Sequence, residues 1–250
     1  MKLALLSDIH ANFQALEACL EHAESAGARQ FAFLGDLVGY GADPVAVIDK
    51  VRDLVAQGAL VVKGNHDAMA VTPPVDAKHL GNSTAQWTCA QLDAQQKDFL
   101  DKLPLTLQYQ AVLLVHASLD GPELWRYVSD QRAATASMDA GAAWPDVRYI
   151  FGGHVHLQTL YYGGMGASLM KFEPTPGIAV PVPRHRRWLA TIGSVGQPRD
   201  GNPQAMYAMF DTDKLQLTFH RVDYDYQAAA TAIRRAGLPV FFADRLERGQ

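Results

Sequence analysis

The chain has 250 residues and has little of several features that mark special classes of protein. Its two cysteines are too few for a disulfide framework, so we expect a reduced, cytoplasmic compartment. Apolar runs fall far short of the roughly 20 residues that a membrane span needs, and the interrupted apolar start predicts no leader peptide. Positive charge is also scarce, because a net charge of −4 gives no basic field for nucleic acid. We expect a globular protein with no membrane or nucleic-acid partner.

What the chain does contain is an alternation of strand-like and helix-like segments near its start, in the order 3–6, 12–26, 31–34, 44–56 and 60–62. This order predicts parallel strands with right-handed crossovers. Farther along, we predict a helix over 84–103, a strand hairpin over 105–115 and a flap or insertion, rich in Gly and Pro, at about 163–187. No linker or repeat interrupts the pattern, so we expect residues 1–250 to form a single α/β domain.

Polar clusters follow the strand-like runs directly. They are Asp8-Ile9-His10, Gly35-Asp36, Gly64-Asn65-His66-Asp67, His116 and Gly152-Gly153-His154-Val155-His156. Open α/β sheets place their ligand sites at the carboxyl ends of strands. Asp8 and His10 are two residues apart, as are His154 and His156, and an extended backbone would direct each pair to one side. Glycines before Asp36, Asn65 and His154 permit close approach of the backbone.

The clusters combine carboxylates, one amide and imidazoles, without a thiolate. This donor set suits Mn²⁺, Fe, Zn²⁺, Co²⁺ or Ni²⁺. Two ions at roughly 3.5–4 Å, sharing one carboxylate, would use so many ligands better than one ion, although a mononuclear hydrolase is an alternative. Each cluster has an ordinary explanation alone, such as a helix cap, a turn or a hydrogen-bonded histidine. Their joint occurrence after several strands favours a metal centre.

The complete set of motifs resembles the calcineurin-like metallophosphoesterase superfamily. The segments 193–201 and 237–239 resemble its small bacterial and archaeal phosphodiesterase-like branch. The resemblance implies an α/β fold in which two packed mixed β-sheets, flanked by helices, form a four-layer sandwich. It also implies that one metal ion is held by Asp8, His10 and His156, and the other by Asn65, His116 and His154, with Asp36 between them. His66 would face the substrate, and Asp67 would orient His66 or a neighbouring imidazole.

The function implied is hydrolysis of a phosphate ester by direct attack of a metal-bridging hydroxide, with His66 as the proton donor. Two divalent transition-metal ions would be the cofactors, with Mn²⁺ favoured. We prefer a small phosphodiester or nucleotide substrate, because the basic run at 184–187 in the flap would hold a second phosphate. A phosphomonoesterase and a dinucleoside polyphosphate hydrolase are alternatives; a non-catalytic binding protein is disfavoured by the complete motif set. Asn12 and Arg199 are weaker candidates for substrate binding.

Overall fold

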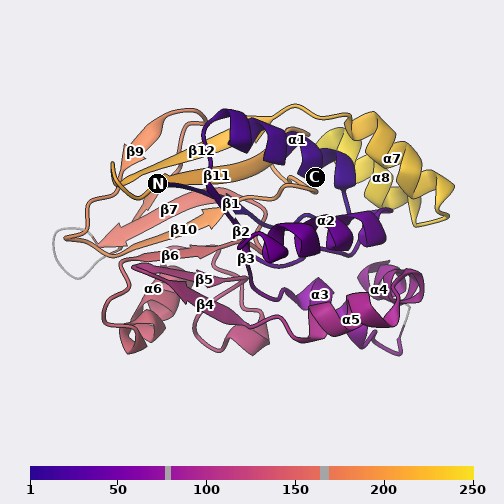
Figure 1. The fold of residues 1–250 in the computed structure, drawn as a ribbon, viewed down its shortest axis with the longest axis horizontal. Helices are drawn as coiled ribbons and strands as arrows, with labels where there is room; N and C mark the ends of the chain where they lie inside the picture. The colour runs from indigo at the N-terminus through magenta and orange to yellow at the C-terminus, as the bar shows by residue number, and fades with distance from the viewer. Residues whose placement is uncertain (77–79, 164–168) are drawn as a thin grey trace.

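The computed structural model describes residues 1–76, 80–163 and 169–250, and Figure 1 shows two packed β-sheets with helices on their outer faces. The first sheet contains, in spatial order, β3 (Leu60–Val61), β2 (Gln30–Phe33), β1 (Lys2–Leu6), β11 (Ala205–Asp211), β12 (Gln216–Val222) and β9 (Ala179–Pro181). The second contains β4 (Thr106–Tyr109), β5 (Val112–Val115), β6 (Tyr149–Gly152), β10 (Trp188–Ile192), β7 (Gln158–Gly163) and β8 (Leu169–Phe172). Each sheet mixes parallel and antiparallel pairs, so the predicted four-layer sandwich is confirmed.

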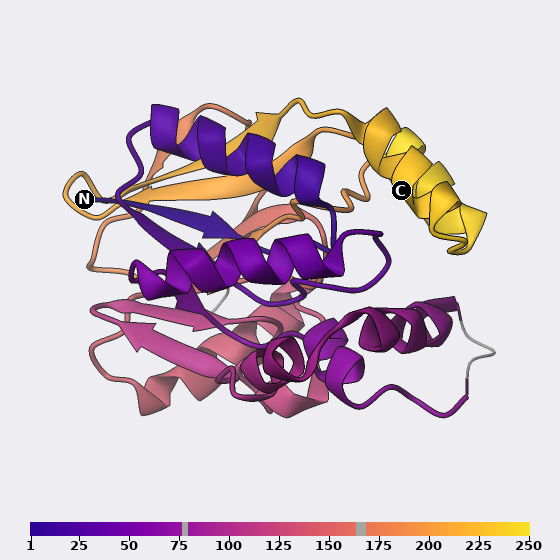
Figure 2. The same ribbon diagram turned by 45° about the vertical axis from the view of Figure 1, so that its right-hand side comes forward.

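The helices are α1 (Phe13–Ser25), α2 (Pro44–Ala56), α3 (Asn65–Val71), α4 (Leu80–Gln91), α5 (Ala94–Asp101), α6 (Gln131–Ala140), α7 (Tyr226–Arg235) and α8 (Val240–Arg248), with short 3₁₀ turns at Pro122–Leu124 and Gly141–Ala143. Figure 2 shows α1 and α2 side by side over the first sheet, and α7 with α8 beyond one end of it. Within the described residues, no helix combines the length and the apolar composition needed to cross a bilayer.

Strand β1 explains why the N-terminal apolar run has no polar alternation. Leu3 and Leu5 are fully buried between the two sheets. Ala4 and Leu6, which point the other way, are fully buried in the core beneath α1 and α2. A strand covered on both faces is apolar at every position. As predicted, β1, β2 and β3 are parallel neighbours, and the helices between them form the crossovers.

The predicted helix over 84–103 is wrong in its extent, because the chain breaks there into α4 and α5. The helix is interrupted before Asp93, which caps the start of α5. The Asp93 carboxylate accepts a hydrogen bond from the amide of Gln96 at 2.7 Å. The Gln96 side chain in turn accepts one from the Asp93 amide at 3.1 Å. This reciprocal capping box starts a new helix. The prediction of a strand hairpin over 105–115 is confirmed by the antiparallel pairing of β4 and β5.

The predicted flap at 163–187 contains regular structure instead of a loop alone. Its residues include the strands β8 and β9, one at an edge of each sheet, while 164–168 lie outside the described residues. The basic run at 184–187 leads into Trp188, which pairs with Tyr149 at the start of β6. Residues His154 and His156 follow the opposite end of β6. The basic run therefore does not reach the candidate site.

Candidate metal centre

The side chains predicted as metal ligands meet at the edge of the sandwich where strands β1, β2, β5 and β6 have their carboxyl ends. Strands β1 and β2, with the start of α3, contribute from the first sheet, and β5 and β6 contribute from the second. Three groups have donor atoms within 4.8 Å of one another, and they are Asp8–His10–His156, Asp36–His116–His154 and His10–Asp36–His66. The fold thus brings together residues that the sequence pattern had grouped, including Asp8 and His156, which are 148 positions apart.

The backbone at these positions is left-handed rather than extended. The φ angles are 53° at Asp8, 50° at His10, 53° at Asp36, 67° at His154 and 59° at His156. The expectation that an extended backbone aligns the two Asp-x-His and His-x-His pairs is therefore wrong, although the side chains do converge. Residues with a Cβ adopt this conformation at a cost of about 1–3 kcal/mol each, and such strain is typical of functional sites.

Two glycines allow the turns to approach one another. A Cβ on Gly153 would collide with the Ser7 hydroxyl and the Asp8 carboxylate. A Cβ on Gly64 would collide with the backbone nitrogen and the carboxylate of Asp36. The prediction that glycines before these ligands permit close approach is thus confirmed at both positions, where any larger residue would push a carboxylate out of place.

Asp67 supports the backbone of the site and not an imidazole. Its buried carboxylate accepts hydrogen bonds from the amides of Leu37 at 2.8 Å, Asp36 at 2.9 Å and Gly64 at 2.9 Å. We expected Asp67 to orient His66 or another ring, and the structure shows instead that it binds the turn that carries Asp36. These three hydrogen bonds fix the turn, while burial and the neighbouring Asp36 raise the pKa of Asp67 to about 7.

Backbone carbonyls determine which ring nitrogens face the centre. The Nδ1 atoms of three histidines donate to carbonyl oxygens, in the pairs His10–Val38 at 3.2 Å, His116–Leu34 at 2.7 Å and His156–Gln197 at 2.6 Å. Because a carbonyl only accepts, each Nδ1 carries the proton. The Nε2 atom of each ring is therefore the nitrogen that faces the centre, where it can bind a metal ion in place of a proton.

The ring nitrogens that face the centre lie close to one another. Nε2 of His10 lies 3.1 Å from Nε2 of His156, and Nε2 of His116 lies 3.2 Å from Nδ1 of His154. The amide oxygen of Asn65 lies 3.2 Å from the same nitrogen of His116. Unprotonated donors at such distances repel unless a cation or proton lies among them. The residues present therefore fit divalent metal ions, and they form two clusters.

The carboxylates complete both clusters. Asp8 Oδ1 lies 3.3 Å from Nε2 of His156, beside the first pair of rings. Asp36 Oδ2 lies 3.3 Å from Nε2 of His116 and 3.8 Å from Nε2 of His10. Asp36 is thus the carboxylate with one oxygen near both clusters, while its other oxygen accepts from the His66 amide at 2.8 Å.

Burial and neighbouring charge separate the protonation behaviour of the rings. Burial acts to lower the pKa of His116, but the adjacent Asp36 and then Asp8 raise it to about 9. Burial and the nearby His116 lower the pKa of His154 to about 4. Burial opposes ionisation of Asp36, yet His116 and His66 hold its pKa well below the usual range. The carboxylates are therefore ionised and attract positive charge into the centre.

His66 lies beside the two clusters, and one of its ring nitrogens makes no hydrogen bond to the described residues. The ring is buried, meets His10 edge-on with centroids 5.1 Å apart, and packs against Tyr40 at 4.3 Å. Its Nδ1 atom has no hydrogen-bond partner among the described residues. Burial lowers the pKa of His66. Sequence reasoning missed Tyr40, because an aromatic residue between two glycines carried no motif.

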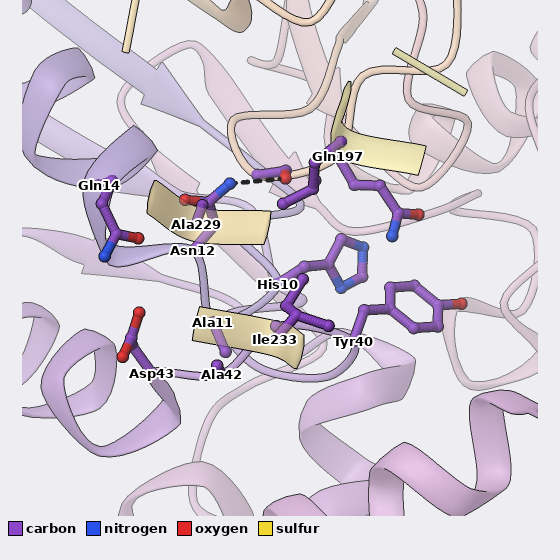
Figure 3. Close-up of a pocket in the computed structure, with 13 residues that line it drawn as sticks. His10, Ala11, Asn12, Gln14, Tyr40, Ala42, Asp43, Gln197, Ala229 and Ile233 are labelled. Carbon is purple, nitrogen blue, oxygen red and sulfur yellow. Dashed lines mark hydrogen bonds between the residues drawn. The ribbon is translucent and has the colours of Figure 1, made fainter. Parts of the chain in front are cut away.

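Asn12 serves the helix rather than a substrate. Its oxygen accepts from the Ala15 amide at 3.1 Å and caps α1. Its nitrogen donates to the Gly196 carbonyl at 2.9 Å and to the Tyr224 hydroxyl at 3.2 Å. Figure 3 shows Asn12 beside a small cavity that His10 and Gln197 also line. Since the donors and the acceptor of this amide are used, the predicted substrate contact of Asn12 is not retained.

A pair of guanidinium groups lies on the His66 side of the centre. Arg199 donates from Nη2 to the Gln197 side chain at 2.9 Å. Burial raises the pKa of Tyr40, and the charge of Arg199 acts to lower it. Arg245, on α8, is close enough to Arg199 that this like charge, after burial, lowers its pKa. Neither forms an ion pair with a carboxylate within the part of the chain that the structure describes. Arg245 was missed, because no motif distinguished it from other charges on an amphipathic helix.

Comparison with known proteins identifies the same scaffold. The calcineurin-like phosphoesterase superfamily domain matches residues 1–215. An uncharacterized protein of Methanocaldococcus jannaschii is 32% identical over 99% of this chain and 98% of its own length. A metallophosphoesterase from Sphaerobacter thermophilus is 32% identical, with a TM-score of 0.86 over the full length of both chains. A hypothetical protein from Pyrococcus horikoshii, 19% identical, shares the fold with a TM-score of 0.77 over 100% of this chain and 98% of its own.

Proposed function

Because this chain belongs to the calcineurin-like phosphoesterase superfamily and is a metal-dependent phosphoester hydrolase, we propose that it cleaves a phosphodiester at a centre of two divalent ions. The observation that carries the proposal is the pair of converging donor clusters with Asp36 Oδ2 near both, 3.3 Å from His116 and 3.8 Å from His10. A mononuclear site would leave one of the two donor clusters without a metal ion.

The proposed division of ligands follows the two clusters. Asp8, His10 and His156 hold one ion, Asn65, His116 and His154 hold the other, and Asp36 contacts both. Two such ions, Mn²⁺ by preference or Fe, Zn, Co or Ni, supply a water of lowered pKa and neutralise the phosphoryl oxygens. The carbonyls of Leu34, Val38 and Gln197 keep the rings in their liganding tautomer.

His66 holds the proton that the leaving alkoxide needs. Its ring lies next to His10 and Asp36, so it reaches the space in front of the clusters. A positioned imidazole of this kind contributes about 10²–10⁴-fold to a proton-transfer step. Direct attack by water leaves no phosphoenzyme.

Arg199 binds a phosphate oxygen or a second anionic group of the substrate. Its guanidinium stands beside Tyr40, which packs on His66, and it lacks a carboxylate partner among the described residues. A guanidinium of this kind is suited to phosphate, because its planar N–H groups match two oxygens. Arg245 adds a second positive charge on the same side.

An activity screen of the Mn²⁺-loaded protein tests the proposal. Hydrolysis of phosphodiesters or cyclic nucleotides faster than of monoesters would support it. Faster turnover of monoesters or dinucleoside polyphosphates would favour one of those alternatives. Reaction in water enriched in a heavy oxygen isotope should place that isotope on the phosphate product in a single turnover. Its appearance on the alcohol instead, or no hydrolysis of any ester, would contradict the proposal.

A further inference from the structure

A groove of about 580 Å³ opens beside the cluster around His116, and neither Arg199 nor Arg245 is among the described residues that line it. We name it the aromatic groove, and the lining residues that matter are Asn65, His154, Trp125, Tyr127 and Met69. Asn65 and His154 belong to the cluster around His116, so the groove begins at the proposed ligands. Its volume lies in the range of about 300–1,000 Å³ that is typical of small-molecule sites.

Two aromatic rings in the groove pack against the imidazoles of that cluster. The ring of Tyr127 stacks on His154, with centroids 4.1 Å apart and planes at 19°, while 55% of Tyr127 remains exposed. The ring of Trp125 meets His116 edge-on at 6.0 Å. Exposed aromatic surface next to a reaction centre is unfavourable in water unless a ligand covers it.

Charge in the groove is already compensated. Lys63 donates to the Asp101 carbonyl at 2.6 Å, and its nitrogen lies 3.8 Å from the Asp101 carboxylate. The described lining residues include no other Lys, Arg, Asp or Glu. The groove therefore suits an uncharged flat group and not a second phosphate. Anionic groups would favour the side of Arg199 and Arg245.

The proton donor contacts the cluster of Asp8, His10 and His156. His66 contacts His10 and Tyr40, and it is not among the described residues that line the aromatic groove. A group seated in the groove is therefore not the group that receives a proton from His66. A monoester has one organic group, whereas a diester has two, so one can occupy the aromatic groove while the other leaves with a proton from His66.

From this arrangement we propose that the aromatic groove binds the nucleoside substituent that a phosphodiester substrate keeps after cleavage. Water forms the new P–O bond, and the P–O bond to the other alcohol breaks. That alkoxide takes one proton through His66, and the second proton goes to solvent. The products are a nucleoside monophosphate and a free alcohol. This inference rests on the proposed phosphodiesterase function and adds the identity of the retained group.

The test uses two diesters with the same leaving group, thymidine 5′-(p-nitrophenyl phosphate) and methyl p-nitrophenyl phosphate. The wild-type protein should prefer the thymidine ester in kcat/KM. Trp125→Ala should lower the ratio of the two kcat/KM values about tenfold, as expected from losing one base-stacking contact. Leu124→Ala, which changes an exposed neighbour outside the groove, should keep the ratio. A ratio that Trp125→Ala leaves unchanged would overturn the inference.

Binding measured by isothermal titration calorimetry separates this inference from the proposed function. Thymidine monophosphate, the predicted product, should bind the wild-type protein more tightly than ribose phosphate does, and Trp125→Phe should keep this binding while Trp125→Ala weakens it. If neither ester is hydrolysed but this binding pattern is found, the proposed function fails and the groove assignment stands. Equal binding of the two phosphates by the wild-type protein would overturn the groove assignment.

Discussion

The two ends of the packed sheets differ in how they hold charge. At the carboxyl ends of the strands, Asp8, Asp36 and His156 are buried, and their backbones are left-handed. At the amino end of β10, the basic run at 184–187 is partly or fully exposed, and the Arg186 guanidinium lies 5.6 Å from the centre of the Tyr162 ring. One end constrains its charged groups among fixed partners, while the other leaves them in water.

The difference shows that local charge density is a poor guide to where a phosphate binds. Four basic or titratable residues in succession attract attention in the sequence, yet they lie at the end remote from the site. The carboxylates at the other end are negative, but the metal ions that we propose they hold would reverse the local charge. On this proposal, the substrate binds at the end of the sheets where the buried carboxylates lie.

The largest expected effect comes from removing the proton donor at the site end. His66→Gln should lower kcat about 10²–10⁴-fold for a diester with an alkyl leaving group. The same substitution should lower kcat far less for a p-nitrophenyl ester, because p-nitrophenolate leaves without a proton. Metal analysis should show unchanged content. Equal loss on both esters would refute proton donation, and loss of an ion would make His66 a ligand.

The next effect tests the close approach of the turns. Gly64→Ala should destabilise the metal-free fold by about 1–3 kcal/mol, because the new Cβ collides with Asp36. The matched control is Gly81→Ala in α4, where the Cβ makes an ordinary contact at 3.8 Å and alanine favours the helix. Urea unfolding measures both. Equal stability of the two variants would show that the Gly64 turn tolerates a side chain.

A smaller effect concerns His220, an imidazole away from the metal centre that has no carboxylate partner among residues 1–76, 80–163 and 169–250. Burial, with nearby His22 and Lys2, lowers the pKa of His220 to about 4. Its folded pKa is below the unfolded value of about 6.5, so the unfolded chain binds the proton better and stability falls as pH falls between these values. His220→Phe keeps the stacking on Tyr207. Its urea midpoint should drop less than that of the wild type between pH 7 and pH 5; an identical drop would contradict the assignment.

The smallest effect is expected at the opposite end. Replacing Arg184 and Arg187 by Ser should change KM for a diester by less than about twofold, because exposed charges are screened by solvent. Arg199→Ser provides the contrast, since that guanidinium stands at the site and its loss should raise KM. A larger rise in KM from the double variant than from Arg199→Ser would mean that the flap contacts the substrate.

Much of the site was predictable because its residues follow apolar strands, and strand ends converge wherever a sheet is packed. Asp36 and His116 could be assigned together for that reason, although nothing in the sequence reveals the positive φ of a residue with a side chain. The supporting role of Asp67 depends on three amides that only the folded turn brings together. Trp125 and Arg245 were beyond prediction, because a loop and a distant helix carry no spacing rule.

The fold shows the same limits. The strands of the core were predicted from their apolar runs, whereas the break at Asp93 was hidden inside a continuous helical pattern. Short edge strands such as β8 and β9 have few buried side chains, so no periodicity reveals them. The single-domain organisation, the choice of metal and the cytoplasmic location stay predictions.

The central claim is that two metal ions share Asp36, and metal analysis after Mn²⁺ loading and desalting tests it most directly. The wild-type chain should retain two ions. Asp36→Asn should retain one or none, while Asp200→Asn, which changes a carboxylate paired with Arg221 outside the ligand clusters, should retain two. A single ion in the wild-type chain, or two in Asp36→Asn, would contradict the account.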